Sequence, residues 1–370
     1  MGIQSASATF TRFLVEDPAK KDFWEYVRRG LQAGAHQEGT GDRAETAGFA
    51  SWDDLFDASF ENDSHHKAEY LAFQFRVDRR KVPSVLLRQQ FKTAVRKFRD
   101  ENGGRWPSRQ DKQKLREDLL DGLLARALPH PSGCEVVWNT RKGTLLVGTR
   151  GKRMTEAVHV HLENHLRIRP APLYHLRWAL RLLAGQPQEA ARLNSMVPTE
   201  SANAREEARF LGYEFLTWLW YSSEDRGGKI VLEDGKQGEI HPGERMVLSR
   251  PDDGRERVVC SSPVVSLDEA RTALQRGKMV EEIQLFLRIG ENEYSLHLDT
   301  DLSSVRGLRT PRQIREPAQE DEADGRFLER MYFLEEVSEG LDAAYRGFLS
   351  QRLSKAWDAK VRPALEKMAK

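Results

Sequence analysis

A row of basic side chains between residues 88 and 99 is the strongest chemical signal in the sequence. Its members recur every three or four residues and would share one flank of a helix; they are Arg88, Lys92, Arg96 and Arg99, with Lys97 beside them. An apolar row displaced by one residue runs along the same segment and consists of Leu87, Phe91, Val95 and Phe98. A helix held by its apolar side would present these cations in a line, which suits a phosphate backbone.

A solvated amphipathic helix is the alternative interpretation of this row. Acidic residues three or four positions away would then be expected to pair with the cations. Few acids interleave on this segment before Asp100. The pattern therefore favours binding to a polyanion.

Basic residues continue along the segments that follow. A second helix, then a β-hairpin and the helix after it, add the candidate phosphate contacts Arg109, Lys112, Arg116, Arg126, Arg141, Lys142, Arg150, Lys152 and Arg153. From Arg79 to Arg153 there are 19 Lys and Arg against 7 Asp and Glu, although the whole chain has a formal net charge of +1. This concentration indicates a polyanion partner. Dense Lys and Arg with little amide content, and no helix-turn-helix or zinc-finger pattern, predict binding without sequence preference.

Two helices, residues 84–102 and 108–127, must position most of these cations. A Gly-Gly pair ends the first and a Pro-Ser pair opens the second, which is typical of a helical hairpin. An alternating strand over residues 70–78 precedes the hairpin, and a β-hairpin turning at Arg141-Lys142-Gly143 follows it. Because strands and helices mix without regular βαβ alternation, we expect an α+β fold.

Three regions are predicted along the 370 residues. Residues 1–169 form an N-terminal α+β region that contains the basic hairpin, residues 84–127, and the β-hairpin. Prolines cluster from Pro170 onward and mark the start of a second α+β region, residues 170–310. Residues 311–370 hold a long C-terminal helix.

Two apolar features of the second half have more than one interpretation. In the helix predicted over residues 324–360, apolar residues recur seven positions apart: Phe327, Leu334, Leu341 and Phe348. Ser338 and Gly340 interrupt this seam, so packing on its own domain is favoured over a dimeric coiled coil. The run Trp218-Leu219-Trp220-Tyr221 could stack on bases, but it lies in a continuously apolar helix, which favours core packing.

Enzyme motifs are missing from the sequence. There is no P-loop lysine, GxSxG, HExxH, CxxC or GxGxxG. His161 and His165 are four residues apart on a predicted helix and could share a metal ion, but no further ligand is identifiable, and ordinary surface histidines are the simpler explanation. We therefore predict no catalytic residue, no metal site and no cofactor.

The sequence also predicts a protein of the cytoplasm. No apolar run approaches the roughly 20 residues of a membrane span, and the first residues lack a basic stretch followed by an apolar one. Two cysteines, Cys134 and Cys260, give no disulfide framework.

A family resemblance emerges at the residues of the basic segment. The run KVPSVLLRQQFKTAVRKF, then LREDLLDGLLARAL, then CEVVWNTRKGTLLVGTRGKRMTEAVHVHLENHL resembles the RdgC family of bacterial recombination-associated proteins. The resemblance extends over about residues 48–166 and more faintly over residues 266–301. It depends on the order of many positions, and no single motif is diagnostic. Residues 226–258 and the C-terminal helix are not covered.

The resemblance implies a ring-shaped homodimer with an RdgC-like α+β fold and a protruding helical hairpin. DNA would pass through a positively charged hole, and the protein would bind single- and double-stranded DNA and limit access of the RecA recombinase to it. Such a protein would be associated with the nucleoid. At the fingertip, where family members carry a bulky aromatic, the resemblance places Leu128, which would then contribute to the dimer gate. The family's basic-polar pair before a later helix falls at Ser262-Pro263, so we transfer no role to those residues.

We expect a non-enzymatic, sequence-independent DNA-binding protein that acts as a dimer in homologous recombination. One alternative is a metal-dependent nuclease whose carboxylates the sequence does not reveal. Another is an interaction protein that uses the acidic segment of residues 316–342, where ten acidic residues face two basic ones.

Overall fold

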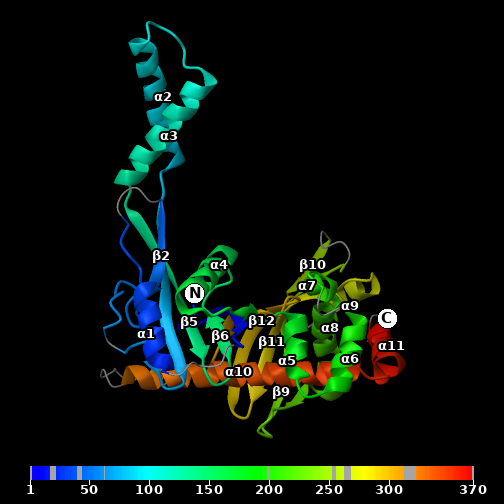
Figure 1. The fold of residues 1–370 in the computed structure, drawn as a ribbon. Coiled ribbons are helices and arrows are strands. Elements are labelled where there is room, and N and C mark those ends of the chain that lie inside the picture. Colours follow the sequence, from blue (N-terminus) through cyan, green and yellow to red (C-terminus); the bar gives the residue numbers. More distant parts are fainter. Residues whose placement is uncertain are drawn as a thin grey trace. The chain divides into compact units, whose positions relative to one another are not determined.

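The computed structural model describes residues 2–16, 22–39, 44–61, 63–197, 201–251, 256–261, 268–311 and 322–368. The chain divides into two compact units (Figure 1). Unit 1 contains residues 1–16, 138–151 and 170–370, and unit 2 contains residues 17–137 and 152–169. Helices and strands mix in both units, which confirms the α+β class.

Unit 2 is built on a small antiparallel sheet. Its elements are α1 (Phe23–Ala33), β2 (Glu45–Ala50), β3 (His66–Lys67), β4 (Tyr70–Arg80), α2 (Ser84–Glu101), α3 (Arg109–Arg126), most of β5 (Pro129–Asn139), α4 (Lys152–His161) and the π-helical turn η1 (Leu162–Leu166). Strand β4 pairs with β2 and β3 and neighbours β5. Phe49, Phe73 and Phe75 from β2 and β4 are fully buried and pack edge to face.

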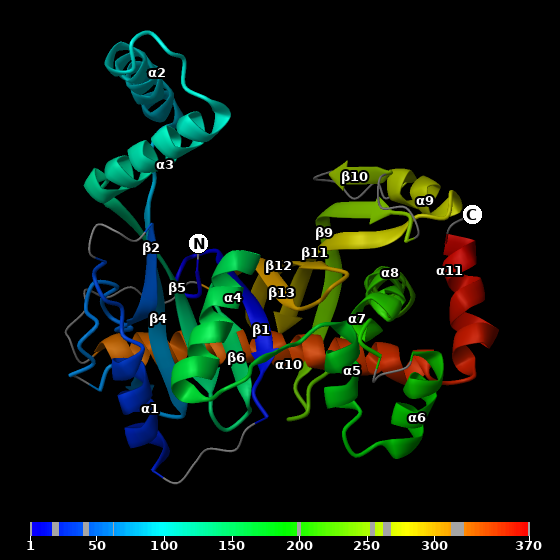
Figure 2. The same cartoon turned by 45° about the horizontal axis from the view of Figure 1, so that its top comes forward.

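Helices α2 and α3 continue directly from this sheet. Only residues 81–83 separate β4 from α2, and only Ala127 and Leu128 separate α3 from β5. Figure 2 shows both helices beyond the ends of β4 and β5, and they pack against each other. The two strands therefore carry the helix pair α2–α3 as an extension of unit 2.

Unit 1 is a larger antiparallel sheet covered by helices. Its strands follow the order β10 (Arg257–Ser261), β9 (Gln237–Ser249), β11 (Met279–Ile289), β12 (Asn292–Asp299), β13 (Ser304–Arg309), β1 (Ala8–Leu14) and β6 (Thr144–Val147). Short strands β7 (Ala171–Pro172) and β8 (Lys229–Val231) pair with β1 and β9. The helical elements are α5 (His175–Leu182), α6 (Pro187–Met196), α7 (Ala204–Glu207), α8 (Arg209–Arg226), α9 (Asp268–Gln275), α10 (Glu322–Arg352), η2 (Trp357–Val361) and α11 (Arg362–Met368).

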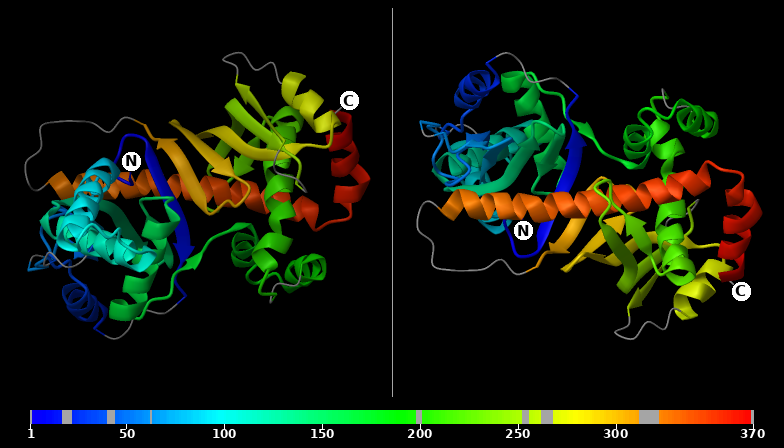
Figure 3. Two further views of the ribbon diagram at one scale, coloured as in Figure 1. Left: turned by 90° about the horizontal axis from the view of Figure 1, so that it is seen from above. Right: turned by 90° about the horizontal axis from the view of Figure 1, so that it is seen from below.

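Helices α8 and α10 form the main apolar layer of unit 1. Helix α8 packs on β9 and β11, and α10 appears in Figure 3 as one uninterrupted helix. The rings of Phe215, Tyr345 and Phe348 are fully buried and pack together, with Tyr345 and Phe348 stacked at 5.7 Å between centroids. Trp218 and Trp220 of α8 are buried as well, which confirms the core interpretation of that aromatic run.

The seven-residue apolar repeat of α10 also belongs to the core. Phe327, Leu334, Leu341 and Phe348 are all buried within the single chain. The preference for packing on its own domain is confirmed, since no second chain is needed to cover these side chains.

The unit boundaries differ from the three predicted regions. One crossing between the units falls at residues 169 and 170, but residues 1–16 and 138–151 join unit 1 because β1 and β6 are strands of its sheet. Helix α10 packs in unit 1 as well, so residues 311–370 are not a region of their own, and the helix ends at Arg352.

Two further findings concern the described part of the chain. None of its helices combines the length and the apolar character of a membrane span. Ser262, Pro263 and the acidic residues 316–321 lie outside the described residues.

Candidate nucleic-acid interface

Local sequence accounts for the ends of both helices of the pair. Pro83 caps α2, and its fixed φ of −57° suits the residue before a first turn. Helix α3 begins with a capping box, in which the Asp111 N–H donates to Ser108 Oγ at 3.2 Å and the Ser108 N–H donates to Asp111 Oδ2 at 2.9 Å. These hydrogen bonds from Ser108, assisted by Arg105, lower the pKa of Asp111.

The turn between the helices exposes an aromatic ring. Gly103 and Gly104 take positive φ values of 61° and 88°, which only glycine adopts freely. Trp106 follows them with 63% of its surface exposed, and the Arg99 guanidinium lies 4.9 Å from its ring centroid. Trp106 lies outside the predicted set of contact residues, although a tryptophan between Gly-Gly and Pro is a signal visible in the sequence.

The helix pair has little core of its own. Neither α2 nor α3 contains a buried residue. The predicted apolar row of α2 is half-buried, and Val85 and Leu86 are exposed. The pair is thus held mainly by its connections to β4 and β5 and by a thin contact between the helices.

A groove between α2 and α3 collects cations from both helices. It has a volume of about 430 Å³. Its lining residues are Ser84, Leu87, Arg88, Phe91, Lys112, Gln113 and Arg116. The structure therefore brings together Arg88, Lys112 and Arg116, three of the predicted phosphate contacts, around the apolar side chains of Leu87 and Phe91.

Most cations of the helix pair have no carboxylate partner. Within the described part of the chain, no acidic oxygen lies within 4 Å of the side-chain nitrogens of Arg88, Lys92, Arg96, Arg99, Arg109, Lys112, Arg116 and Arg126. Lys97 is 3.7 Å from Glu101, in a contact between two exposed side chains that adds little. These cations remain available to an external anion.

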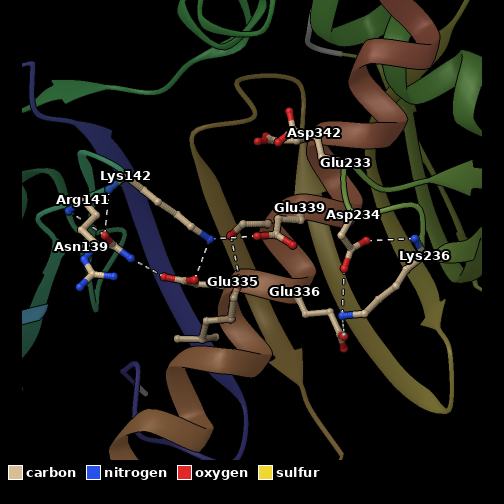
Figure 4. Close-up of polar contacts among 12 residues, drawn as sticks. Asn139, Arg141, Lys142, Glu233, Asp234, Lys236, Glu335, Glu336, Glu339 and Asp342 are labelled. Carbon is tan, nitrogen blue, oxygen red and sulfur yellow. Dashed lines mark hydrogen bonds and ion pairs between the residues drawn. The ribbon is translucent and has the colours of Figure 1, made fainter. Parts of the chain in front are cut away.

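Lys142 is different, because α10 neutralises it (Figure 4). Its Nζ donates to Glu335 Oε2 at 2.8 Å and to Glu339 Oε1 at 2.9 Å. Glu335 also accepts from Asn139 Nδ2 at 2.6 Å. Although burial opposes it, this pairing raises the pKa of Lys142. Binding a phosphate here would require the ammonium to leave two carboxylates.

Two more predicted contacts are paired within their own units. Arg150 Nη2 lies 2.8 Å from Asp299 Oδ2 in unit 1, and Arg153 pairs with Glu45 in unit 2. Arg141 and Lys152 are exposed, and no carboxylate within the described ranges pairs with either. The structure thus separates the predicted cations into a free group on α2–α3 and a partly neutralised group on residues 141–153.

Leu128 does not lie at the tip of the helix pair, which corrects the position given to it by the resemblance. Helix α3 ends at Arg126, and Leu128 lies between the cap residue Ala127 and β5. It is 80% exposed at the sheet end of α3, away from the turn. The physical reason is that the turn is set by Gly103 and Gly104, one helix length earlier in the chain.

The acidic face of α10 is largely occupied inside unit 1. Besides Glu335 and Glu339, Glu336 accepts from Asn292 Nδ2 at 2.7 Å and from the hydroxyls of Tyr294 and Tyr332. Asp342 accepts from Trp178 Nε1 at 2.6 Å. The described part of the predicted acidic segment therefore uses these carboxylates in intramolecular contacts.

The histidine pair lies in unit 2 against aromatic rings. His161 and His165 contact the ring of Phe49, and the His161 Nδ1 lies 2.9 Å from the Ala157 carbonyl. No group of three or more potential ligands for a metal ion is found among the residues that the structure describes.

Part of this chain is similar to proteins of one family. The family model described as "Putative exonuclease, RdgC" matches residues 20–181. The recombination-associated proteins RdgC of Neisseria meningitidis serogroup C / serotype 2a and of Neisseria gonorrhoeae are each 33% identical to this chain over 85 residues. That stretch is 23% of this chain and 28% of each relative, so the match spans little more than a quarter of the relatives' length.

Proposed function

We propose that this protein, whose residues 20–181 match the RdgC family model, binds DNA without sequence preference and takes part in homologous recombination. The binding surface is the helix pair α2–α3, which lies entirely inside the matched segment. Curated relatives carry the name recombination-associated protein, which supports the process. The protein acts in the cytoplasm, in association with the nucleoid.

One observation carries the proposal: among the described residues, most cations of α2–α3 have no carboxylate partner, whereas carboxylates engage Lys142, Arg150 and Arg153. Cations without partners break no internal ion pair when they bind phosphates, and their binding releases counterions from the DNA. The groove of Arg88, Lys112 and Arg116 adds apolar side chains against which a sugar or base could rest.

The family resemblance extends the proposal to assembly and target. The protein forms a ring-shaped homodimer that encircles single- or double-stranded DNA and limits the access of RecA. The turn of the helix pair, with exposed Trp106, is the part that contacts the second copy. Aromatic side chains are enriched at such contacts because they bury a large area with few rotatable bonds.

Charge reversal on α2 tests the interface. The variant R88E/K92E/R96E should lower DNA affinity about 100-fold or more near 50 mM salt, and it should reduce the slope of log K against log salt by roughly 3 for duplex DNA. The matched control K355E/K360E/K367E changes the chain's charge equally, with three exposed lysines that follow α10. A salt slope equal to that of the unchanged protein would overturn the interface.

Two experiments test encirclement and competition. Complexes on circular plasmid should survive a salt challenge that releases them from the linearised plasmid, since a ring can slide off free ends. In strand-exchange reactions, protein added to single-stranded DNA before RecA should inhibit, and the R88E/K92E/R96E variant should not. Equal release from circular and linear DNA would argue against a ring.

An exonuclease is the second candidate, favoured by the description of the matching family model. We propose binding without cleavage, because the helix-pair cations suit contact with the backbone and carry no group for bond-making. Incubation of end-labelled DNA with the protein and Mg²⁺ or Mn²⁺ distinguishes the two. An exonuclease would be established if labelled nucleotides were released in proportion to the protein concentration and if a chelator abolished this release.

A further inference from the structure

A second cluster of cations lies in unit 1, on the strands β9, β10 and β11 and the end of α9. It surrounds a pocket of about 520 Å³. The lining residues are Arg250, Glu256, Arg257, Val258, Arg276 and Lys278. Four of these six side chains are basic and one is acidic, so the pocket has an excess of positive charge.

Lys278 gives the pocket a buried ammonium group. The residue is only 6% exposed, and Gly277, with φ of 76°, turns the chain from α9 towards it. Its Nζ donates to Glu256 Oε2 at 2.8 Å and lies 3.3 Å from the Glu256 carbonyl. A buried ammonium needs an anion beside it, and here that anion belongs to a side chain that is itself 70% exposed.

Two arginines complete the cluster around the same carboxylate. Lys278 is the main cause that lowers the pKa of Glu256, and the charges of Arg250 and Arg276 lower it further. Arg250 Nη2 lies 3.4 Å from the Arg276 carbonyl, which links the end of β9 to the end of α9. Neither guanidinium forms an ion pair with a described residue.

Arg257 closes the pocket from β10. Its Nη2 donates to the Glu281 carboxylate of β11, in the same sheet, and Glu281 is buried. Arg257 is thereby fixed in orientation, and its own charge is balanced. Among the described lining residues, the remaining three cations share the single carboxylate of Glu256, which leaves an excess of two positive charges.

We propose that this pocket is a phosphate-binding site, and that Glu256 holds the anion position until a phosphate group displaces its carboxylate from Lys278. A phosphate group offers several acceptor oxygens and up to two negative charges, which matches one ammonium and two guanidinium groups better than a single carboxylate does. The volume also admits the sugar attached to such a phosphate. The site is in a different unit from α2–α3 and does not rest on the function proposed for that pair.

Calorimetric titration with inorganic phosphate tests the site directly. The unchanged protein should bind phosphate saturably, E256Q should bind it about 5-fold more tightly, and R276Q about 10-fold more weakly, because a charge-assisted hydrogen bond is lost. The matched control K229Q removes an exposed lysine of β8 and should leave the affinity unchanged. R276Q and K229Q change exposed side chains and should keep the thermal transition of the unchanged protein. E256Q removes the partner of a buried ammonium, so a lower transition that phosphate raises is expected for it.

The source of the phosphate group is distinguished by two competitors. If a nucleoside monophosphate displaces inorganic phosphate as efficiently as a DNA strand does, the site is one for small molecules. Displacement only by a 5′-phosphorylated oligonucleotide, and not by its 5′-hydroxyl counterpart, would identify a strand end. No saturable phosphate binding to E256Q up to about 10 mM, or equal affinity in R276Q and the unchanged protein, would overturn the proposal.

Discussion

Helices α2 and α10 both carry dense rows of charge, yet the chain uses them in opposite ways. On α10, Leu341 and Phe348 are fully buried, and Glu335, Glu336 and Asp342 accept hydrogen bonds from other parts of unit 1. On α2 no residue is buried, and most cations have no acidic partner in the described part of unit 2.

The contrast separates charge used for folding from charge left for a ligand. A carboxylate that accepts from Trp178 or Lys142 orients elements of its own unit and is unavailable to a partner. A guanidinium without a partner does not orient elements of its own unit in this way, so it is available to bind a ligand. Net charge along a segment cannot reveal this difference, but pairing can.

Core truncation should give the largest contrast between the two helices. Phe348→Ala removes a fully buried ring from α10 and should lower the free energy of unfolding of unit 1 by about 3–5 kcal/mol. Phe91→Ala removes a half-buried ring from α2 and should cost about 1 kcal/mol or less. Urea unfolding followed by circular dichroism measures both, and equal losses would contradict the division.

The core of unit 1 should also respond to pH where the helix pair does not. Burial lowers the pKa of His175 to about 4, and its Nδ1 accepts from the Leu176 N–H at 2.8 Å. In the unfolded chain the imidazole binds a proton once the pH is below its ordinary pKa of about 6.5, whereas in the folded chain it does so only near pH 4. The free energy of unfolding should therefore decrease as the pH falls from 6.5 to 4, by about 3 kcal/mol in total.

Replacement of His175 tests whether this residue causes the pH dependence of stability. In His175→Gln, the loss of stability between pH 6.5 and 4 should be smaller than in the unchanged protein. Helices α2 and α3 contain no histidine, so DNA affinity at constant salt should not change stepwise over the same pH range. Thermal unfolding across this pH range provides the measurement. An unchanged pH dependence in the variant would assign it to other groups.

Single-lysine replacements sharpen the comparison at the level of DNA binding. Lys92→Gln should reduce affinity for duplex DNA by about 3- to 10-fold and the salt slope by roughly 0.9, as loss of one phosphate contact does. Lys142→Gln should leave the slope unchanged, since Glu335 and Glu339 already hold that ammonium. Fluorescence anisotropy at several salt concentrations gives both values, and a lower slope for Lys142→Gln would show that the pairing breaks on DNA.

The smallest effect is expected at the turn. Trp106→Phe should change the free energy of unfolding by less than about 0.5 kcal/mol, because the ring is exposed and its contact with Arg99 is retained by phenylalanine. At protein concentrations low enough to dissociate the proposed dimer, iodide quenching of tryptophan emission should lose most of its accessible component in this variant, since most other tryptophans are buried. Unaffected quenching in the dissociated protein would contradict the exposure of Trp106.

Local pattern was sufficient for the helices of the candidate interface. The predicted spans 84–102 and 108–127 agree closely with α2 and α3 because glycine and proline act on the backbone where they stand. Strand β2 lies in a stretch rich in Gly, Glu and Thr, a composition that is typical of loops. Its identity as a strand comes from pairing with β4, which no local signal reveals.

The sequence by itself determined where cations concentrate, where the two helices begin and end, and which apolar rows belong to the core. Only the tertiary structure decided which of those cations are free. Glu335 meets Lys142 across 193 positions of sequence, and Glu256 meets Lys278 across 22, and neither distance follows from spacing along the chain. Periodicity is a property of neighbours in sequence, whereas the pairing of charges depends on the fold that brings distant segments within a few ångströms.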